Sequence, residues 1–256
     1  MKYVYPKFDG IDLYFFRLGG CGLGNLLYPF FRALVYAKKE NLEIISPTFQ
    51  SIKIGPYLRM ESQKRNYKYT FKESIKGIRK LWLLIFSNEI VTFKSFGDGF
   101  KSLYGYEDFL KEKFKTLTSV NFDERKYQNC ICCHVRLGDF KPQEGVLLNN
   151  NNRIPIEWYK NVILKLRKKD KKLKVFLFSD GNQYELKELL DLDNVINDTS
   201  NNPIEDILKL SSSKYLIGSY SSFSFWGAFF SKGTSIWHEN AFNIKEFPQN
   251  SKYFLM

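Results

Sequence analysis

The sequence predicts an α/β fold in which two Rossmann-like lobes each carry a parallel sheet. Apolar runs rich in β-branched and aromatic residues alternate with helical patterns, an order typical of parallel sheets with helices on both faces. The alternation occurs in two series that separate near residues 117–128. We expect an N-terminal lobe over residues 1–122 and a C-terminal lobe over residues 123–256, whose last residues can pack back on the first lobe.

The first series begins with a predicted strand at Leu13–Leu18, which a glycine loop joins to a helix over Asn25–Lys39. Residues 46–66 have no regular pattern, and Gly97-Asp98-Gly99 predicts a turn. The other elements expected here are a strand at Leu42–Ile45, a helix around Phe71–Phe86 and a strand at Ile90–Phe93.

The second series predicts five strands and four helices. The helices are expected to start at Pro155, near Gln183, at Pro203 and near Ser222, because proline suits a first helical turn. Residues 136–153 predict a long loop rich in Asn. The strands are expected at Cys130–Val135, Val175–Phe178, Val195–Ile196, Tyr215–Gly218 and Thr234–Trp237.

The composition of the 256 residues indicates a folded core and anionic partners. Hydrophobic residues make up 44% of the chain, which excludes disorder, and the formal net charge is +12. Nucleic acid, an anionic membrane surface and a phosphorylated small molecule all fit that charge. The sequence contains no recognisable nucleic-acid module and no basic helix stripe, so a nucleic-acid-binding protein is the less favoured interpretation.

The four cysteines do not predict a disulfide framework or a metal site. Cys130, Cys132 and Cys133 share one apolar run, and Cys21 stands apart. Residues 130 and 132 of a strand point to one side and residue 133 to the other. No second Cys/His cluster follows, so we expect reduced thiols and no metal.

The chain is expected to be cytoplasmic. Its start has no apolar segment of the signal-peptide kind, and no apolar run reaches the ~18 residues of a membrane span. The run Leu81–Phe86, preceded by Lys76, Arg79 and Lys80, could lie on the inner face of a membrane. A core helix with a basic outer face is the favoured alternative.

Glycine-rich or polar segments follow several predicted strands, where open parallel sheets bind ligands. In the first, Gly19–Asn25, glycines allow close backbone approach and a helix N-terminus offers N–H groups to an anion. The third glycine of the dinucleotide pattern is missing, which disfavours an NAD(P) oxidoreductase. A tight strand-to-helix turn without a ligand is the alternative. The other segments are His134–Asp139, Ser179–Gly181 and Gly218–Ser224.

The segment His134–Asp139 points to diphosphate binding. A guanidinium such as that of Arg136 can fork two phosphate oxygens, and the imidazole of His134 can donate to a phosphate or orient a neighbour. A salt bridge from Arg136 to Asp139 that holds the loop is an alternative compatible with this role. The serines at 221, 222 and 224 add hydroxyls at a helix start, although Ser is also an ordinary N-cap residue.

These motifs together resemble the α-1,2-fucosyltransferase family, glycosyltransferase family 11. The resemblance rests on GLGN near the start, HxRxGD in mid-chain, FSD after the next strand and SSFSxWGA near the end. It extends from Gly19 to about Trp237 and is weak across residues 46–120. It implies a GT-B-like fold and metal-independent, inverting transfer of fucose from GDP-fucose to a galactose hydroxyl, in polysaccharide biosynthesis.

The resemblance also implies roles for individual residues. Arg136 and His134 match the family's HxRR motif, whose first arginine contacts the diphosphate. Asp180 matches a position that often holds guanine through its N–H groups. Residues matching the family's remaining nucleotide-sugar contacts are Gly22, Gly24 and Asn25 in the N-terminal loop and Ser221, Ser222 and Ser224 near the phosphates.

Departures from the family pattern leave alternatives open. Leu137 stands where a second arginine is usual, and Phe225-Trp226 replaces the usual Trp-Trp. A different nucleotide-sugar donor and a nucleotide-sugar-binding protein without catalysis therefore remain alternatives. Asp139 is the first candidate for the general base that deprotonates the acceptor, with Glu144 and Asp98 as further candidates.

Overall fold

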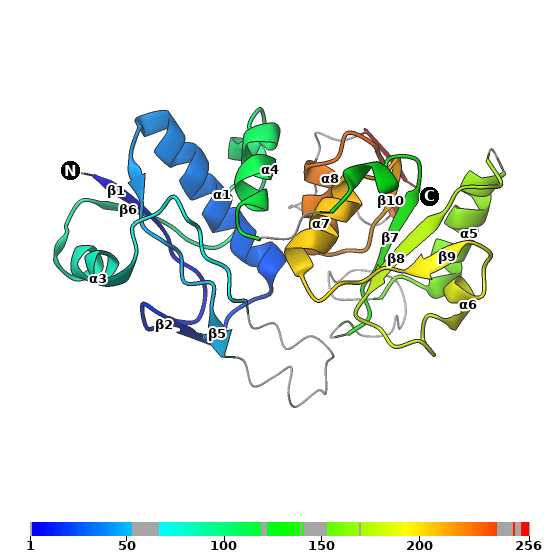
Figure 1. The fold of residues 1–256 in the computed structure, drawn as a ribbon, viewed down its shortest axis with the longest axis horizontal. Helices are drawn as coiled ribbons and strands as arrows, with labels where there is room; N and C mark the ends of the chain where they lie inside the picture. The colour runs from blue at the N-terminus through cyan, green and yellow to red at the C-terminus, as the bar shows by residue number, and fades with distance from the viewer. Residues whose placement is uncertain are drawn as a thin grey trace. The chain divides into compact units, whose positions relative to one another are not determined.

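The computed structural model describes residues 2–52, 67–118, 122–138, 140, 153–168, 170–239 and 248, and the backbone of 252–255. The chain divides into two compact units, Met1–Ser119 and Val120–Met256 (Figure 1). Both units contain parallel strands connected through helices. The predicted α/β class with parallel sheets is therefore confirmed.

The N-terminal unit contains a parallel sheet in the order β4-β1-β6. Its strands are β1 (Tyr3–Pro6), β4 (Glu43–Ile44) and β6 (Ile90–Phe93). A second small sheet has the order β2-β3-β5, formed by Ile11–Asp12, Arg17–Leu18 and Ser51–Ile52. The helices of this unit are α1 (Leu23–Glu40), α3 (Gly77–Phe86) and α4 (Glu107–Lys115), with a short 3-10 turn at Lys101–Leu103.

Helix α1 forms the centre of this unit, as the sequence predicted for Asn25–Lys39. Its side chains Tyr28, Phe30 and Phe31 are completely buried. The Phe30 ring meets the rings of Phe49 and Phe71 edge to face at 5.5 and 5.4 Å, a favoured aromatic geometry. The helix ends at Asn41, which adopts the left-handed conformation common at helix ends.

Four features of the N-terminal unit differ from the prediction or were missed. Leu13–Leu18 is not one strand, because Tyr14 turns the chain at φ 68° between β2 and β3. The central strand β1 was not predicted, since it is only four residues long and ends in proline. Helix α3 starts at Gly77, whose φ of 57° interrupts the helix expected from Phe71. Helix α4 was also not predicted.

The side of helix α3 that is buried differs from the favoured prediction, which was a core helix with a basic outer face. Lys80 and Leu83 are its buried residues, whereas Trp82 and Phe86 are exposed. The Lys80 ammonium donates to the Tyr14 carbonyl at 2.7 Å and the Thr48 hydroxyl at 2.8 Å. Burial lowers the pKa of Lys80 to about 8.

The C-terminal unit contains a six-stranded, fully parallel sheet in the order β12-β11-β10-β7-β8-β9. Its connecting helices are α5 (Ile156–Arg167), α6 (Lys187–Leu190), α7 (Pro203–Ser211) and α8 (Ser222–Phe229). The strands are β7 (Ile131–Val135), β8 (Val175–Ser179), β9 (Val195–Asn197), β10 (Tyr215–Ile217), β11 (Thr234–Trp237) and β12 (Lys252–Leu255). The five predicted strands and four predicted helices are confirmed, although α6 is shorter than expected; β12 was not predicted.

The strand order reverses between β7 and β10. From β7 the chain moves outward through β8 to β9, and it then returns to the other side of β7 as β10 and moves outward through β11 to β12. The connections on the two sides of this point leave in opposite directions. Such a switch point opens a crevice at the carboxyl ends of the strands, where open parallel sheets bind ligands.

No helix within the described ranges is long and apolar enough to cross a membrane.

The packing at the end of β10 requires a glycine at position 218. A Cβ atom at Gly218 would overlap the six-membered ring of Trp237, which is fully buried and donates its indole N–H to Ser235 at 3.0 Å. We predict that Gly218→Ala lowers the free energy of unfolding by about 1–3 kcal/mol through overpacking. Urea denaturation followed by tryptophan fluorescence measures this. The control is Lys214→Ala, which changes an exposed residue next to the same strand and should alter the free energy of unfolding by less than about 0.5 kcal/mol. An equal loss of stability in both variants would contradict overpacking at Gly218.

Candidate nucleotide-sugar site

The candidate residues of the C-terminal unit gather around the switch point. His134 lies near the end of β7, Asp180 directly after β8, and Ser219 shortly after β10. The first turn of α8, which contains Ser222 and Ser224, follows. The parallel sheet thus brings residues that are up to 90 positions apart in sequence into contact.

His134 and three serines form one buried hydroxyl cluster. The Nδ1 atom of His134 lies 2.6 Å from Oγ of Ser224 and 2.9 Å from Oγ of Ser219. The Ser219 hydroxyl is also 3.2 Å from those of Ser221 and Ser224. The imidazole ring stacks on Phe223 with centroids 4.9 Å apart. These contacts connect the end of β7 to the start of α8.

The surroundings of His134 determine the protonation state of its imidazole. Burial lowers the pKa of His134 well below its ordinary value, with the nearby Asp180 opposing and Arg136 reinforcing that shift. His134 is therefore neutral at pH 7. The Ser224 hydroxyl accepts the Ser219 N–H at 3.1 Å. Nδ1 of His134 donates to or accepts from the hydroxyls of Ser219 and Ser224 according to the tautomer of the ring.

Arg136 and Asp180 form an ion pair at the ends of β7 and β8. The distance from Nη1 to Oδ2 is 2.5 Å, and the two side chains are 20 and 17% exposed. The other carboxylate oxygen accepts the N–H groups of Leu137 and Gly138 at 2.8 and 3.1 Å. The guanidinium also lies over the Phe140 ring at 5.5 Å. Asp180 thus holds both the Arg136 side chain and the backbone after it.

The residues after Arg136 fit this contact sterically. A Cβ atom at Gly138 would overlap the Asp180 carboxylate, and one at Gly181 would overlap the Leu137 side chain. Leu137 itself is only 3% exposed. The position where the family pattern has a second arginine is therefore a core position in this chain.

The start of α8 is a helix N-terminus capped by a serine side chain. Ser221 is the N-cap residue, and its hydroxyl accepts the Ser224 N–H at 3.3 Å. The first N–H groups of a helix have no partner within the helix and favour anions. The sequence prediction missed Ser219 and Phe223 as parts of this cluster, although both belong to the same Ser-rich segment. Their positions next to the matched serines in the sequence could have indicated that they belong to the cluster.

The N-terminal glycine loop belongs to the other unit. Gly22 is the N-cap of α1, Gly24 is buried in its first turn, and the Asn25 N–H donates to the Gly22 carbonyl at 3.1 Å. The N–H of Leu23 donates to the Tyr67 hydroxyl at 3.1 Å. This is a tight turn into a helix, the alternative that the sequence left open, and ligand binding there stays a prediction.

A buried arginine that the sequence analysis missed supports this glycine loop. Arg17 is fully buried, and its guanidinium donates to the carbonyls of Thr48 at 2.6 Å and of Asp9. A Cβ atom at Gly20, whose φ is +95°, would overlap the Asp9 carbonyl and crowd the same guanidinium. The first half of the loop is therefore packed against Arg17.

The general base stays a prediction. Asp139, the first candidate, and Glu144 lie outside the described residues, and so does the predicted alternative of an Arg136–Asp139 salt bridge. Asp98 lies in the N-terminal unit, where it accepts the Ser102 hydroxyl at 3.1 Å. That contact gives Asp98 a structural role in its turn.

The cysteines of β7 and Cys130 directly before it are buried, free thiols. Burial raises the pKa of Cys130 and of Cys132, which disfavours the thiolate that a metal requires. In the part of the chain that the structure describes, no three His, Cys, Asp or Glu residues gather in a way that could hold a metal ion. Metal-independent activity stays a prediction.

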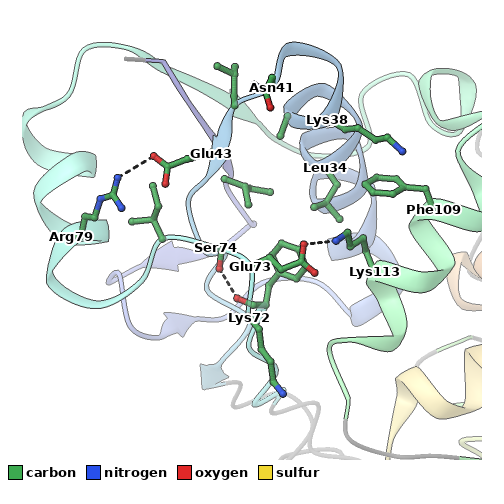
Figure 2. A pocket seen from close by; sticks show the side chains of 15 residues that line it. Leu34, Lys38, Asn41, Glu43, Lys72, Glu73, Ser74, Arg79, Phe109 and Lys113 are labelled. Carbon is green, nitrogen blue, oxygen red and sulfur yellow. Dashed lines mark hydrogen bonds and ion pairs between the residues drawn. The ribbon is translucent and has the colours of Figure 1, made fainter.

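The described residues of the N-terminal unit line a larger and a smaller surface pocket. The larger, of about 650 Å³, lies at the C-terminal end of α1, away from the glycine loop, and Figure 2 shows its side chains. Its charged residues form pairs, Arg79 with Glu43 at 3.0 Å and Lys113 with Glu73. The smaller, of about 240 Å³, lies beyond the carboxyl end of β4. Its lining includes Tyr14, Tyr69, Thr48, Gln50 and Lys68.

Comparison with known proteins identifies a family. A family model described as glycosyl transferase family 11 matches residues 39–253. The match includes the switch-point residues and leaves out Gly22, Gly24 and Asn25. No curated protein sequence matches the chain.

Similar solved structures include those of NodZ and POFUT1. NodZ α-1,6-fucosyltransferase soaked with GDP-fucose has a TM-score of 0.47 and 12% identity, over 90% of this chain and 92% of that one. POFUT1 in complex with GDP has a TM-score of 0.49 and 11% identity, over 92 and 98% of the two chains. NodZ from Bradyrhizobium has a TM-score of 0.44 and 10% identity, over 90 and 93%.

The neutral state of His134 makes stability depend on pH. In the unfolded chain a histidine binds a proton near pH 6.5, whereas the folded protein resists this because the pKa is lowered. The stability present above that pH is therefore lost as the pH falls, by up to about 1.4 kcal/mol per pH unit. Urea denaturation from pH 7 to pH 5 should show a weaker pH dependence for His134→Asn than for the wild type.

His238→Asn is the matched control, since His238 is the other histidine of the chain and is half-buried. This variant should keep most of the wild-type pH dependence. The same pH dependence in the wild type and in His134→Asn contradicts the assignment of a neutral, buried imidazole.

Proposed function

Since the chain belongs to glycosyltransferase family 11, we propose that it transfers fucose from GDP-fucose to a galactose hydroxyl of a glycan in α-1,2 linkage. The observation that carries the proposal is that Arg136 and the serine-rich start of α8 follow neighbouring parallel strands, β7 and β10, at the switch point. A guanidinium and a helix N-terminus suit a diphosphate. The reaction inverts the anomeric centre and uses no metal.

Asp180 positions Arg136 in this proposal. Its carboxylate already has the guanidinium and two backbone N–H groups as partners, so both oxygens are engaged. Holding one arginine rotamer reduces the entropy lost when the guanidinium binds phosphate. The role that the resemblance implies for Asp180, accepting N–H groups of guanine, requires that these contacts change, and it is the alternative that an experiment must separate.

His134 orients hydroxyls and does not carry charge. Its Nδ1 atom lies within hydrogen-bond distance of the Ser219 and Ser224 hydroxyls, and a neutral imidazole next to Arg136 adds no repulsion to the guanidinium. We therefore assign His134 a positioning role at the start of α8.

Charge develops on the diphosphate as the acceptor oxygen attacks the anomeric carbon and the bond to the leaving GDP breaks. Arg136 and the N–H groups of α8 stabilise that charge, a contribution that is commonly the largest in such catalysis. Asp139 is the proposed general base that takes the proton from the acceptor hydroxyl. The acceptor glycan is assigned to the N-terminal unit, where the smaller pocket offers Tyr14 and Tyr69 as stacking surfaces and Thr48 and Gln50 as polar partners.

A nucleotide-sugar-binding protein without catalysis is the second candidate, and buried Leu137 favours it because the usual second cation is missing. Incubation with GDP-fucose and galactosides separates the two functions. GDP release that depends on the acceptor supports transfer, whereas binding without release supports the second candidate. A panel of GDP- and UDP-sugars tests whether another donor is used.

Removing the guanidinium tests the assignment of the diphosphate site. We predict that Arg136→Ala lowers kcat by about 10²–10³-fold with the fold intact, since one donor to the developing charge is lost. GDP release with a galactoside acceptor measures the rate, and circular dichroism checks the fold. Arg125→Ala, which removes an exposed arginine of the same unit, is the control. Near-wild-type turnover of Arg136→Ala rules out the assignment.

The two roles considered for Asp180 predict different specificities for the nucleobase of the donor. If Asp180 positions Arg136, Asp180→Asn should weaken binding of GDP and of inosine diphosphate by the same factor, on the order of tenfold. Calorimetry with both nucleotides measures this. If Asp180 holds guanine, the wild type prefers GDP, whose extra amino group inosine lacks, and Asp180→Asn removes that preference. A lost preference therefore contradicts the positioning role.

A further inference from the structure

Helix α3 of the N-terminal unit presents an apolar side to solvent. Ile78, Trp82, Ile85 and Phe86 are 84, 58, 53 and 65% exposed. At about 100° per residue, these four side chains lie within roughly a third of the helix circumference. They form one continuous stripe, which we call the α3 face. Its orientation is the reverse of a helix that covers a core.

The other side of α3 is fixed to the unit. Leu83 packs into a buried cluster with Tyr5, Ile45 and Ile75. The buried Lys80 ammonium donates to the Tyr14 carbonyl and the Thr48 hydroxyl. Turning the α3 face inward would break two hydrogen bonds of a buried cation, which is costly. The exposed apolar stripe is therefore built into the fold.

Positive charge accompanies the α3 face. Lys72, Lys76 and Arg79 lie on or just before the helix and are exposed, and Arg79 also pairs with Glu43. Residues 1–119 contain 20 Lys and Arg against 11 Asp and Glu, whereas residues 120–256 contain 19 against 16. Most of the net charge of +12 thus lies in the unit that carries the apolar stripe.

An anionic lipid surface matches both features. Apolar and aromatic side chains of an interfacial helix enter the boundary between headgroups and acyl chains, and tryptophan favours that depth. Basic side chains next to such a helix are attracted to anionic headgroups. A protein partner would need only the apolar stripe and gives no reason for the charge excess of the whole unit.

We propose that the α3 face docks the protein on an anionic membrane surface, with Trp82, Ile85 and Phe86 among the headgroups and Lys72 and Lys76 facing lipid phosphates. The apolar part of the docking surface is separate from the transferase reaction, because Trp82, Ile85 and Phe86 line neither described pocket of the N-terminal unit. Lys76 also lines the smaller pocket. The helix enters the interface and does not cross the membrane.

Vesicle sedimentation with the full chain tests the proposal. The wild type should bind vesicles that contain phosphatidylglycerol and should bind phosphatidylcholine vesicles much more weakly. The double variant Trp82→Glu/Phe86→Glu should lose binding to the anionic vesicles by on the order of tenfold or more. Because both side chains are exposed, its circular dichroism and its GDP release with a soluble acceptor should match the wild type.

Tyr184→Glu is the matched control, an 88% exposed aromatic residue of the C-terminal unit, and should bind vesicles as the wild type does. Absence of wild-type binding, or equal binding by the double variant, overturns the proposal. Equal affinity for the two vesicle types overturns the role of charge. Self-association that requires Trp82, without vesicle binding, assigns the α3 face to a second copy of the chain and also overturns it.

Discussion

The contact between Asp180 and Arg136 is the interaction on which the candidate site depends. One carboxylate at the end of β8 binds the guanidinium that follows β7 and the two N–H groups after it. Oδ1 of Asp180 accepts the two backbone N–H groups, and Oδ2 forms the ion pair with the guanidinium. The carboxylate therefore holds the guanidinium at the edge of the sheet, and a side chain at Gly138 would overlap the carboxylate.

The strand order places this contact at the switch point of the sheet. Because β8 and β10 flank β7 in parallel, the ends of all three strands open at the same edge. On one side of the switch point Asp180 orients Arg136, and on the other His134 joins the serine cluster to α8. One side supplies a fixed positive charge and the other a helix N-terminus. Both features suit the same diphosphate, whose binding is the basis of the proposed transfer.

Much of the C-terminal unit could be predicted from the sequence, for a physical reason. Fully buried parallel strands such as Ile131–Val135 are continuous apolar runs, and Pro203 together with the Asn202 cap defines the start of α7. The N-terminal unit was harder, because its short strands depend on tertiary pairing. The orientation of α3 could not be read from its pattern, since burial of Lys80 is decided by the Tyr14 carbonyl and the Thr48 hydroxyl. Likewise, the choice of Asp180 as partner for Arg136 depends on strand register across 44 residues.

The central claim is that a nucleotide diphosphate binds at the switch point of the C-terminal unit. A crystal structure of the full chain with GDP tests it most directly. We expect a phosphate of GDP within hydrogen-bond distance of the Arg136 guanidinium and of the first N–H groups of α8. A diphosphate bound at the glycine loop of the N-terminal unit, or at a site without contact to Arg136, would contradict it.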